Sequence, residues 1–337
     1  MIEITESPDV TGWREFVYNH PHGNIFQMPE MAEVYKHTKN YEPITLAAVE
    51  SNTDKILALV NGVVIKELNG FMGQFTARSV IQGGPLSTSG EEGKRAVKLL
   101  MEYYSSVAGN KALYTQIRNM WDTSEISDVL KDIGYEYEEH LNILVDLTVT
   151  KEDAWNRLSK SKRRYIRKAK NSGTVIEEAE DIEDIKSFYG ILSETYSRAK
   201  LPLADMSLFI SAFELLMPKN FIKYFLARND GKTVGGIMAP LFKGNIYEWY
   251  VCGSRKYSEL YPSEMVTWYP IQWGIENKLS TFDFGGAGKP DEEYGVREFK
   301  KQFGGDVVNF GRYEKIHSRL KMRLVDTGYS IYKKTFL

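Results

Sequence analysis

A strongly basic segment at residues 160–170, KSKRRYIRKAK, is the part of the chain whose composition is most suited to binding chemistry. Seven of its eleven residues are Lys or Arg, although the whole chain carries a formal net charge of −2. At helical spacing Arg163, Arg167 and Lys170 share one face, and Ile166 can pack inward. Cations this concentrated repel one another unless anions lie nearby, so the segment predicts binding of phosphate, carboxylate or nucleic acid. A solvated helix face without a ligand is the alternative.

A second candidate is the lysine-bearing stretch at residues 282–305, FDFGGAGKPDEEYGVREFKKQFGG. One glycine pair begins at Gly285, after a short apolar strand, and another begins at Gly304, after the segment that holds Phe299 and Lys300. Glycine tolerates close approach of the backbone to a ligand, so two such pairs around one lysine indicate a site. An ordinary strand–loop–helix connection is the alternative. The stretch is neither a P-loop nor a dinucleotide-binding fingerprint, because its glycines lack the spacing that each motif requires.

The remaining composition excludes several classes of site. The single cysteine, Cys252, cannot form an intramolecular disulfide, and its strand-like surroundings predict a buried, inert thiol. The five histidines show no metal-ligand spacing, so neither a metal site nor a cofactor is expected. The N-terminus lacks a basic and apolar leader, and no apolar run reaches the length of a membrane span. We therefore expect a soluble, cytoplasmic protein with no membrane span; its oligomeric state is open.

Hydrophobic periodicity predicts helices and strands that would position these residues. In the first half we expect helices at 13–19, 27–37, 91–107 and 124–133, and strands at 44–49, 56–65, 112–117 and 141–147. In the second half we expect helices at 154–158, 163–170, 182–196, 206–216, 263–277 and 317–332, and strands at 175–176, 221–227, 234–242, 246–252, 282–284 and 307–310. The strands at 221–252 form a meander joined by tight turns.

The order of elements begins again near the middle of the chain. Thr150 predicts a helix N-cap, with Asp153 three residues later as its acidic partner. The sequence therefore predicts an α+β fold built twice, with domains at 1–149 and 150–337.

Three motifs in this order along the chain resemble those of the FemABX peptidyltransferases. They are SKRRYIRKAKNSG at 161–173, YVCGSRKYSELYPSEMVTWYPIQWGI at 250–275, and FDFGG followed by GVREFKKQFGG and GRY at 282–313. The resemblance covers most of the second half and extends more weakly into the first through NIFQMPEM at 24–31 and IQGGP at 81–85. It implies two tandem domains like those of the acyl-CoA N-acyltransferases (GNAT), each a mixed or antiparallel sheet flanked by helices, with a cleft between them. The basic helix runs directly into a strand, so the chain resembles the FemX-like type without a helical-hairpin insertion.

The resemblance also implies a reaction and its residues. FemABX enzymes transfer an aminoacyl group from aminoacyl-tRNA to an amine of a cell-wall peptide precursor, so aminoacyl-tRNA and a peptide or nucleotide-sugar-peptide acceptor are the implied partners. The family's catalytic lysine falls on Lys300, whose ammonium can stabilise the oxyanion that develops when an amine attacks an ester. Guanidinium groups of the arginine-rich helix can hold a diphosphate or a carboxylate. The implied substrate-binding residues are Arg163, Arg164, Arg167, Tyr250 and Phe299.

Two departures from the family pattern leave alternatives open. Glu30 and Glu33 stand in the first-half helix where the family often has a basic residue that reaches the nucleotide-sugar, which argues against a UDP-muramyl acceptor. Gly253, Ser254 and Arg255 stand in place of the glycine-rich loop with which acetyltransferases hold the CoA pyrophosphate, so CoA is disfavoured. The alternatives are a GNAT-like N-acyltransferase that uses acyl-CoA or an acyl carrier on an amino-sugar or amine, and a non-catalytic RNA- or anion-binding protein. No general base is identifiable from the sequence.

Overall fold

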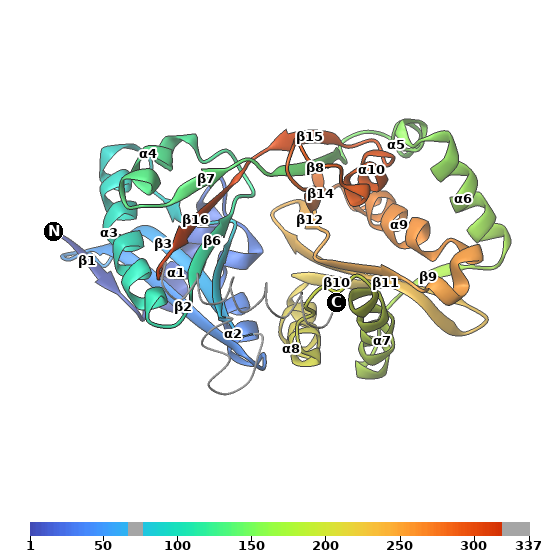
Figure 1. The fold of residues 1–337 in the computed structure, drawn as a ribbon, viewed down its shortest axis with the longest axis horizontal. Coiled ribbons are helices and arrows are strands. Elements are labelled where there is room, and N and C mark those ends of the chain that lie inside the picture. The colour runs from blue at the N-terminus through green and yellow to red at the C-terminus, as the bar shows by residue number, and fades with distance from the viewer. Residues whose placement is uncertain (67–76, 319–337) are drawn as a thin grey trace, which may run out of the picture. The chain divides into compact units, whose positions relative to one another are not determined.

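The computed structural model describes residues 1–66 and 77–318, which fall into two compact units (Figure 1). Unit 1 comprises Met1–Glu139 and the segment from Phe310 onward, and unit 2 comprises His140–Asn309. These bounds differ from the expected domains at 1–149 and 150–337. The difference arises because each unit takes one strand from the half of the chain that was assigned to the other.

Unit 1 is a mixed sheet with helices on both faces. Its elements are β1 (Ile2–Thr5), α1 (Val10–Asn19), η1 (Ile25–Gln27), α2 (Pro29–Lys36), β2 (Tyr41–Glu50), β3 (Ile56–Ile65), β4 (Arg78–Gln82), β5 (Leu86–Ser87), α3 (Gly90–Gly109), β6 (Tyr114–Arg118), α4 (Ser124–Asp132), β7 (Glu136–Glu138) and β16 (Arg312–Ile316). The strand order is β1-β2-β3-β4-β6-β16-β7, with β5 also paired to β3. All pairs are antiparallel except β4 with β6, which is parallel.

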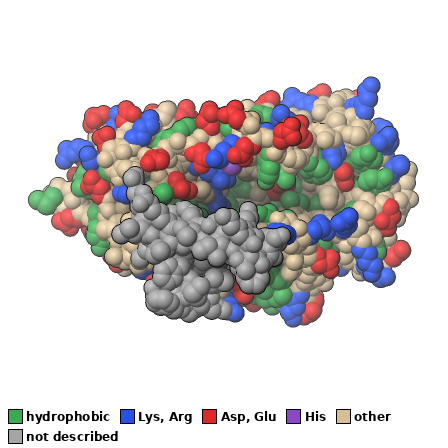
Figure 2. All heavy atoms as spheres, viewed as in Figure 1, with side chains coloured by type: hydrophobic (Ala, Val, Ile, Leu, Met, Phe, Trp, Pro, Cys, Tyr) green, Lys and Arg blue, Asp and Glu red, His purple; other side chains and the backbone are tan. Residues whose placement is uncertain are grey.

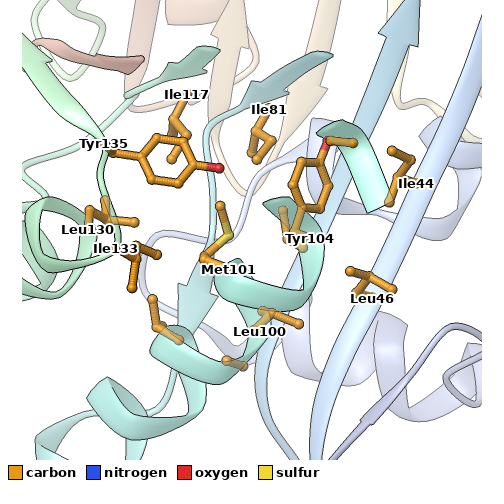
Figure 3. Packing of buried hydrophobic residues seen from close by; sticks show 14 of the residues in the cluster. Ile44, Leu46, Ile81, Leu100, Met101, Tyr104, Ile117, Leu130, Ile133 and Tyr135 are labelled. Carbon is orange, nitrogen blue, oxygen red and sulfur yellow. The ribbon is translucent and has the colours of Figure 1, made fainter. Parts of the chain in front are cut away.

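The core of unit 1 lies between the sheet and α3 (Figure 3). Alternate residues of β2, such as Ile44 and Leu46, point into this core, as the period of a half-buried strand requires. Tyr104 of α3 is fully buried and its hydroxyl lies 2.7 Å from Ser79 Oγ. Gly62 of β3 leaves the space for that hydroxyl, since a Cβ atom there would lie 2.0 Å from it.

Unit 2 is built in the same way. Its elements are β8 (Leu141–Asp146), α5 (Lys151–Arg157), α6 (Lys160–Asn171), β9 (Val175–Glu178), α7 (Ile182–Arg198), α8 (Met206–Leu216), η3 (Met217–Lys219), β10 (Ile222–Asn229), β11 (Lys232–Phe242), β12 (Asn245–Tyr247), β13 (Tyr250–Gly253), η4 (Arg255–Leu260), α9 (Pro262–Glu276), β14 (Thr281–Gly286), α10 (Gly295–Lys301) and β15 (Asp306–Asn309). The strand order is β15-β8-β14-β12-β11-β10-β9, with β13 also paired to β11. Helix α9 packs against one face of this sheet, and α7 and α8 pack against the other (Figure 1).

The two sheets follow one plan. In each, antiparallel strands lead to a strand that is split in two (β4 and β5 in unit 1, β12 and β13 in unit 2), and the first piece pairs in parallel with the strand after the long helix. The strand after β7 does not stay in unit 1 but pairs as β8 in unit 2, and the strand after β15 returns as β16 to unit 1. The chain therefore exchanges one strand between the units.

Most predicted elements are present, and local sequence explains their ends. Thr150 caps α5 as expected, because its side chain accepts a hydrogen bond from the Asp153 amide at 3.1 Å. The expected strand at 246–252 is instead two strands, β12 and β13. The helix expected at 317–332 falls almost entirely outside the described residues. The structure confirms the predicted α+β fold.

Candidate active site

The split between β12 and β13 is the feature around which the candidate site of unit 2 is built. Strand β11 pairs with β13 up to Met238↔Tyr250 and resumes with β12 at Leu241↔Ile246. The segment between the pairs is one residue longer on the β12–β13 side, which is a β-bulge. Its amides are satisfied in two directions, since Glu248 N donates to Asp283 O of β14 at 2.8 Å and Trp249 N donates to Met238 O of β11 at 3.1 Å.

Lys300, the predicted catalytic residue, lies directly beside this bulge. It belongs to α10, and its side chain is only 9% exposed. The ammonium forms an ion pair with Glu248 Oε1 at 3.1 Å and donates hydrogen bonds to the carbonyl oxygens of Phe284 and, at 3.2 Å, Gly286. These three oxygens match the three N–H donors of a lysine. The sequence analysis singled out Lys300 near the glycine pair at Gly285, but it did not identify the glutamate that pairs with it.

Two buried carboxyl groups surround the ammonium. Burial raises the pKa of Glu248, and the attraction of Lys300 offsets this only in part. Burial likewise raises the pKa of Asp283 from its ordinary value of 3.8 to about 6, against the hydrogen bonds that Gly285 N and Asn142 give to it. Gly285 has a φ of +65°, a conformation that favours glycine and that turns its amide back onto the carboxylate. The arrangement places one cation beside two buried carboxyl groups whose pKa values are both raised by burial, that of Asp283 to about 6.

Phe299 links α10 to the basic helix α6. Its ring lies 3.7 Å from Lys162 Nζ, measured to the ring centroid, and Lys162 is buried and paired with Glu264 Oε1 at 2.8 Å. At the same C-terminal end of α10, Ser159 N donates to the oxygen of the C-cap residue Gln302 at 2.9 Å. The first turn of α6 is therefore fixed to the helix that carries Lys300. Lys162 belongs to the basic segment at 160–170, but its side chain is buried in this contact and does not face outward with the arginines.

The three predicted arginines lie on the outer surface of α6. Arg163 Nη1 donates to Asn156 O at 3.4 Å, Arg164 Nη2 donates to Tyr165 Oη at 3.1 Å, and Arg167 Cζ lies 5.4 Å from the centroid of the Trp155 ring. None of these guanidinium groups has a carboxylate partner, and none contacts Lys300, in the described part of the chain. Figure 2 shows Lys and Arg side chains recurring along the margin of unit 2 where Figure 1 places α6.

Tyr250 points away from the ion pair. Its half-buried ring packs against Phe209 of α8, with ring centroids 4.8 Å apart, and near Tyr196 of α7 at 6.0 Å. It therefore lies on the face of the sheet that α7 and α8 cover. Cys252 faces the same way, and its thiol is buried with a raised pKa, which confirms the prediction of a buried, inert thiol.

Sequence reasoning missed Glu248 and Asp283 as members of the site. A signal existed for both, because each is a single acid within an otherwise apolar strand segment, IYEWYV and FDF. An acid at such a position is buried, and buried carboxylates require partners. Lys300 is distant from both acids in the sequence, so its pairing with Glu248 could not be predicted from the sequence.

Residues 1–66 and 77–318 offer neither a metal-binding cluster nor a membrane-spanning helix. They contain no cluster of three or more His, Cys, Asp or Glu side chains placed to hold a metal ion. No helix within them has the length and apolar character needed to cross a membrane.

Two protein-family models match the chain. The model of the FemAB family matches residues 9–215, and that of an acetyltransferase (GNAT) domain matches residues 156–301, which include Lys300. A search of curated proteins found no match.

Solved structures show the same fold across nearly the whole chain. The crystal structure of FemX has a TM-score of 0.71 at 17% identity and covers 96% of this chain and 99% of its own. A tandem GNAT protein from the clavulanic acid biosynthesis pathway has a TM-score of 0.62 at 7% identity, covering 94% and 99%. L-PGS from Bacillus licheniformis has a TM-score of 0.58 at 17% identity, covering 96% and 98%. These matches confirm the predicted tandem GNAT-like fold. Because the family model spans more than half of the sequence, the chain belongs to the FemAB family and is an acyltransferase.

Proposed function

We propose that this protein transfers an aminoacyl group from aminoacyl-tRNA to an amine of a cell-wall-type peptide precursor, with the chemistry at the β12–β13 bulge of unit 2. The observation that carries the proposal is the buried ion pair of Lys300 with Glu248, in a domain of acyltransferase type. Perturbed ionisable groups that are buried beside an irregular strand are typical of active sites.

The reaction requires little from the protein beyond charge and position. The acceptor amine attacks the ester carbonyl carbon, a C–N bond forms, and the bond from that carbon to the ribose oxygen of the tRNA breaks. The proton lost by the amine ends on the ribose oxygen. An ester is already activated, so a cation that stabilises the developing oxyanion supplies the main catalytic effect.

Lys300 is the proposed catalytic residue, and the structure sharpens how it would act. Its hydrogen bond to Gly286 O, at 3.2 Å, is the longer of its two bonds to backbone carbonyls, and Gly286 is exposed. We propose that the substrate oxygen replaces Gly286 O as the third acceptor. Glu248 acts as a positioning residue, because the ion pair with its carboxylate holds the ammonium beside the bulge.

The donor is proposed to be aminoacyl-tRNA because the structure disfavours CoA. A pyrophosphate would be bound by free amides at the N-terminus of the long helix α9. In this chain Tyr261 stands at that N-terminus, and the Tyr165 ring of α6 stacks on it with centroids 4.7 Å apart. The loop at Gly253 packs tightly against the start of α9, since a Cβ atom on Gly253 would lie 2.9 Å from Ser263 N, and this leaves little room for a ligand there. Helix α6 thus covers the place where a CoA pyrophosphate would bind and presents its own arginines outward.

The acceptor is proposed to be a peptide amine, and the objection to a nucleotide-sugar carrier is weaker than the sequence suggested. Glu30 is buried, and its Oε1 receives hydrogen bonds from Arg14 Nε at 3.1 Å and from Arg14 Nη2 at 2.8 Å. A carboxylate neutralised in this way repels a diphosphate much less than an exposed one.

Donor competition tests the proposal. The protein is incubated with a cell-wall precursor peptide, either free or UDP-linked, and with labelled aminoacyl-tRNA or labelled acetyl-CoA. Label in the peptide fraction from charged tRNA alone supports the proposed reaction. Label from acetyl-CoA alone would instead identify the N-acyltransferase alternative. RNA binding without any transfer would favour the non-catalytic alternative.

A further inference from the structure

A groove between α5, α6 and α9 in unit 2 has a composition that the proposed chemistry does not use. It consists of two adjoining hollows of about 400 and about 320 Å³, which share Lys170, Trp268 and Gln272 in their walls. The first hollow is also lined by Trp155, Arg167, Lys151 and one acid, Glu152. The groove therefore combines aromatic rings with cations from the outer face of α6.

The two tryptophan rings of the groove are recessed rather than projecting, and Trp155 is the one that keeps an accessible surface. Trp155 and Trp268 meet edge to face, with centroids 5.4 Å apart and planes at 64°. Trp268 is only 4% exposed and Trp155 is half-buried, so both rings are recessed. The Arg167 guanidinium lies 5.4 Å from the Trp155 centroid, which extends the surface with a flat cation.

The cations at the rim are available for an anionic ligand. Lys151 is paired with Glu276 Oε1 at 2.5 Å, but no carboxylate lies within ion-pair distance of Arg167 or Lys170 in the residues that the structure describes. Stacking surfaces next to unpaired cations are the combination with which proteins hold single-stranded nucleic acid: bases stack and phosphates meet the cations. A membrane surface would favour projecting rings, which this groove lacks.

We infer that this groove holds an unpaired base of the single-stranded 3′ end of an RNA, with its phosphates on Arg167 and Lys170. The inference rests on the proposed use of aminoacyl-tRNA as donor and assigns the place where the end of that RNA docks. The contact of Lys162 in α6 with the Phe299 ring in α10 connects this docking surface to the helix that carries Lys300.

Binding of an uncharged RNA hairpin, followed by fluorescence anisotropy, tests the inference without requiring turnover. One hairpin carries an unpaired ACCA 3′ end and the other is blunt. We expect the native protein to prefer the unpaired end, and Trp155→Ala to abolish that preference, a loss of roughly 5- to 100-fold for one stacked base. Arg167→Glu and Lys170→Glu, both exposed on α6, should each weaken binding about 10-fold and lower the salt dependence.

The control is Lys232→Glu, which makes the same change of charge at the exposed β10–β11 turn. The inference is overturned if the groove variants bind RNA as this control does, or if blunt and unpaired ends bind equally. It is also overturned if the groove variants lose binding to phosphatidylglycerol vesicles while RNA binding is unchanged. Transfer from charged tRNA that persists in such a case would leave the proposed function standing. A native protein with neither RNA affinity nor transfer would contradict both.

Discussion

The two units place different side chains beside a split strand. In both, the central strand of the sheet is divided into two pieces. In unit 1 a neutral amide fills the gap: Gln27 Nε2 donates to Asn61 O at 3.1 Å and Gln82 O at 2.9 Å, and its Oε1 accepts from Asn61 N at 2.8 Å. In unit 2 the amides of the split are bonded to backbone carbonyls, and the charged side chains of Lys300 and Glu248 lie beside the split, where the ammonium donates to two carbonyl groups of β14.

This difference separates a structural role from a chemical one. A neutral amide network satisfies the backbone and carries no charge that a reaction could use. A buried ion pair is a weak source of stability, since desolvation offsets most of its attraction, and its presence suggests another use. We therefore assign a structural role to the Gln27 hydrogen-bond network and the proposed transfer chemistry to the ion pair of Lys300 with Glu248.

Removal of the cation should have the largest effect. Lys300→Met leaves Glu248 buried without its partner, so we expect a loss of about 3–5 kcal/mol in the free energy of unfolding. Transfer activity per folded molecule should fall at least about 100-fold, as for loss of an oxyanion donor. Urea unfolding and transfer assays measure the two effects.

The double variant Lys300→Met with Glu248→Gln separates these effects. We expect it to regain most of the stability, because no charge is then left unpaired, and to regain none of the activity. Recovery of activity in the double variant would contradict a catalytic role for Lys300.

Asp283 should give unit 2 a characteristic pH dependence. Its pKa is raised from 3.8 to about 6 in the folded protein, so the folded state holds the proton more tightly than the unfolded state. The stabilisation is present below pH 4 and is lost as the pH rises through 6, by about 3 kcal/mol. The unfolding free energy of the native protein minus that of Asp283→Asn should fall by about 2 kcal/mol of this total between pH 4 and 6.5, and a flat difference would show that Asp283 ionises normally.

Disruption of the neutral network should destabilise the protein without affecting chemistry. Gln27→Leu leaves the Asn61 amide and two carbonyl groups without their partner, at a cost of about 1–3 kcal/mol. The transfer rate per folded molecule should stay within about twofold of the native rate, whereas the Lys300 variants lose at least about 100-fold. A loss in Gln27→Leu as large as in Lys300→Met would remove the distinction between the units.

His317 should give unit 1 the opposite and smallest pH dependence. Burial lowers its pKa from 6.5 to about 4, and Thr115 Oγ1 lies 2.7 Å from its Nε2. The unfolded state therefore binds the proton more tightly, and stability is lost as the pH falls from 6.5 to 4. The side chain is partly exposed, so we expect an effect on the order of 1 kcal/mol in the native protein compared with His317→Gln. A slope of the opposite sign would contradict this reading.

The sequence predicted most of the secondary structure and one member of the central pair. Hydrophobic patterning located β3, β10, β11 and α3, because the strands are short apolar runs bounded by turn residues and α3 repeats its apolar residues at helical spacing. It could not locate the split at Glu248, since a one-residue bulge leaves the aromatic run around it unchanged. The sequence also could not predict that β8 pairs within unit 2 and β16 within unit 1. The apolar pattern of a strand shows which of its faces is buried, but it does not show which strand is its partner. Lys300 was found through its motif, whereas Glu248 required the fold that brings the two together.

The ratio of two transfer rates tests the central claim most directly. Single-turnover transfer of label from charged tRNA is measured for Lys300→Met/Glu248→Gln and for Gln27→Leu, each corrected for its folded fraction. We predict that the Gln27 variant keeps the native rate while the double variant is slower by at least about 100-fold. Equal rates in the two variants would contradict the assignment of the chemistry to the ion pair of unit 2.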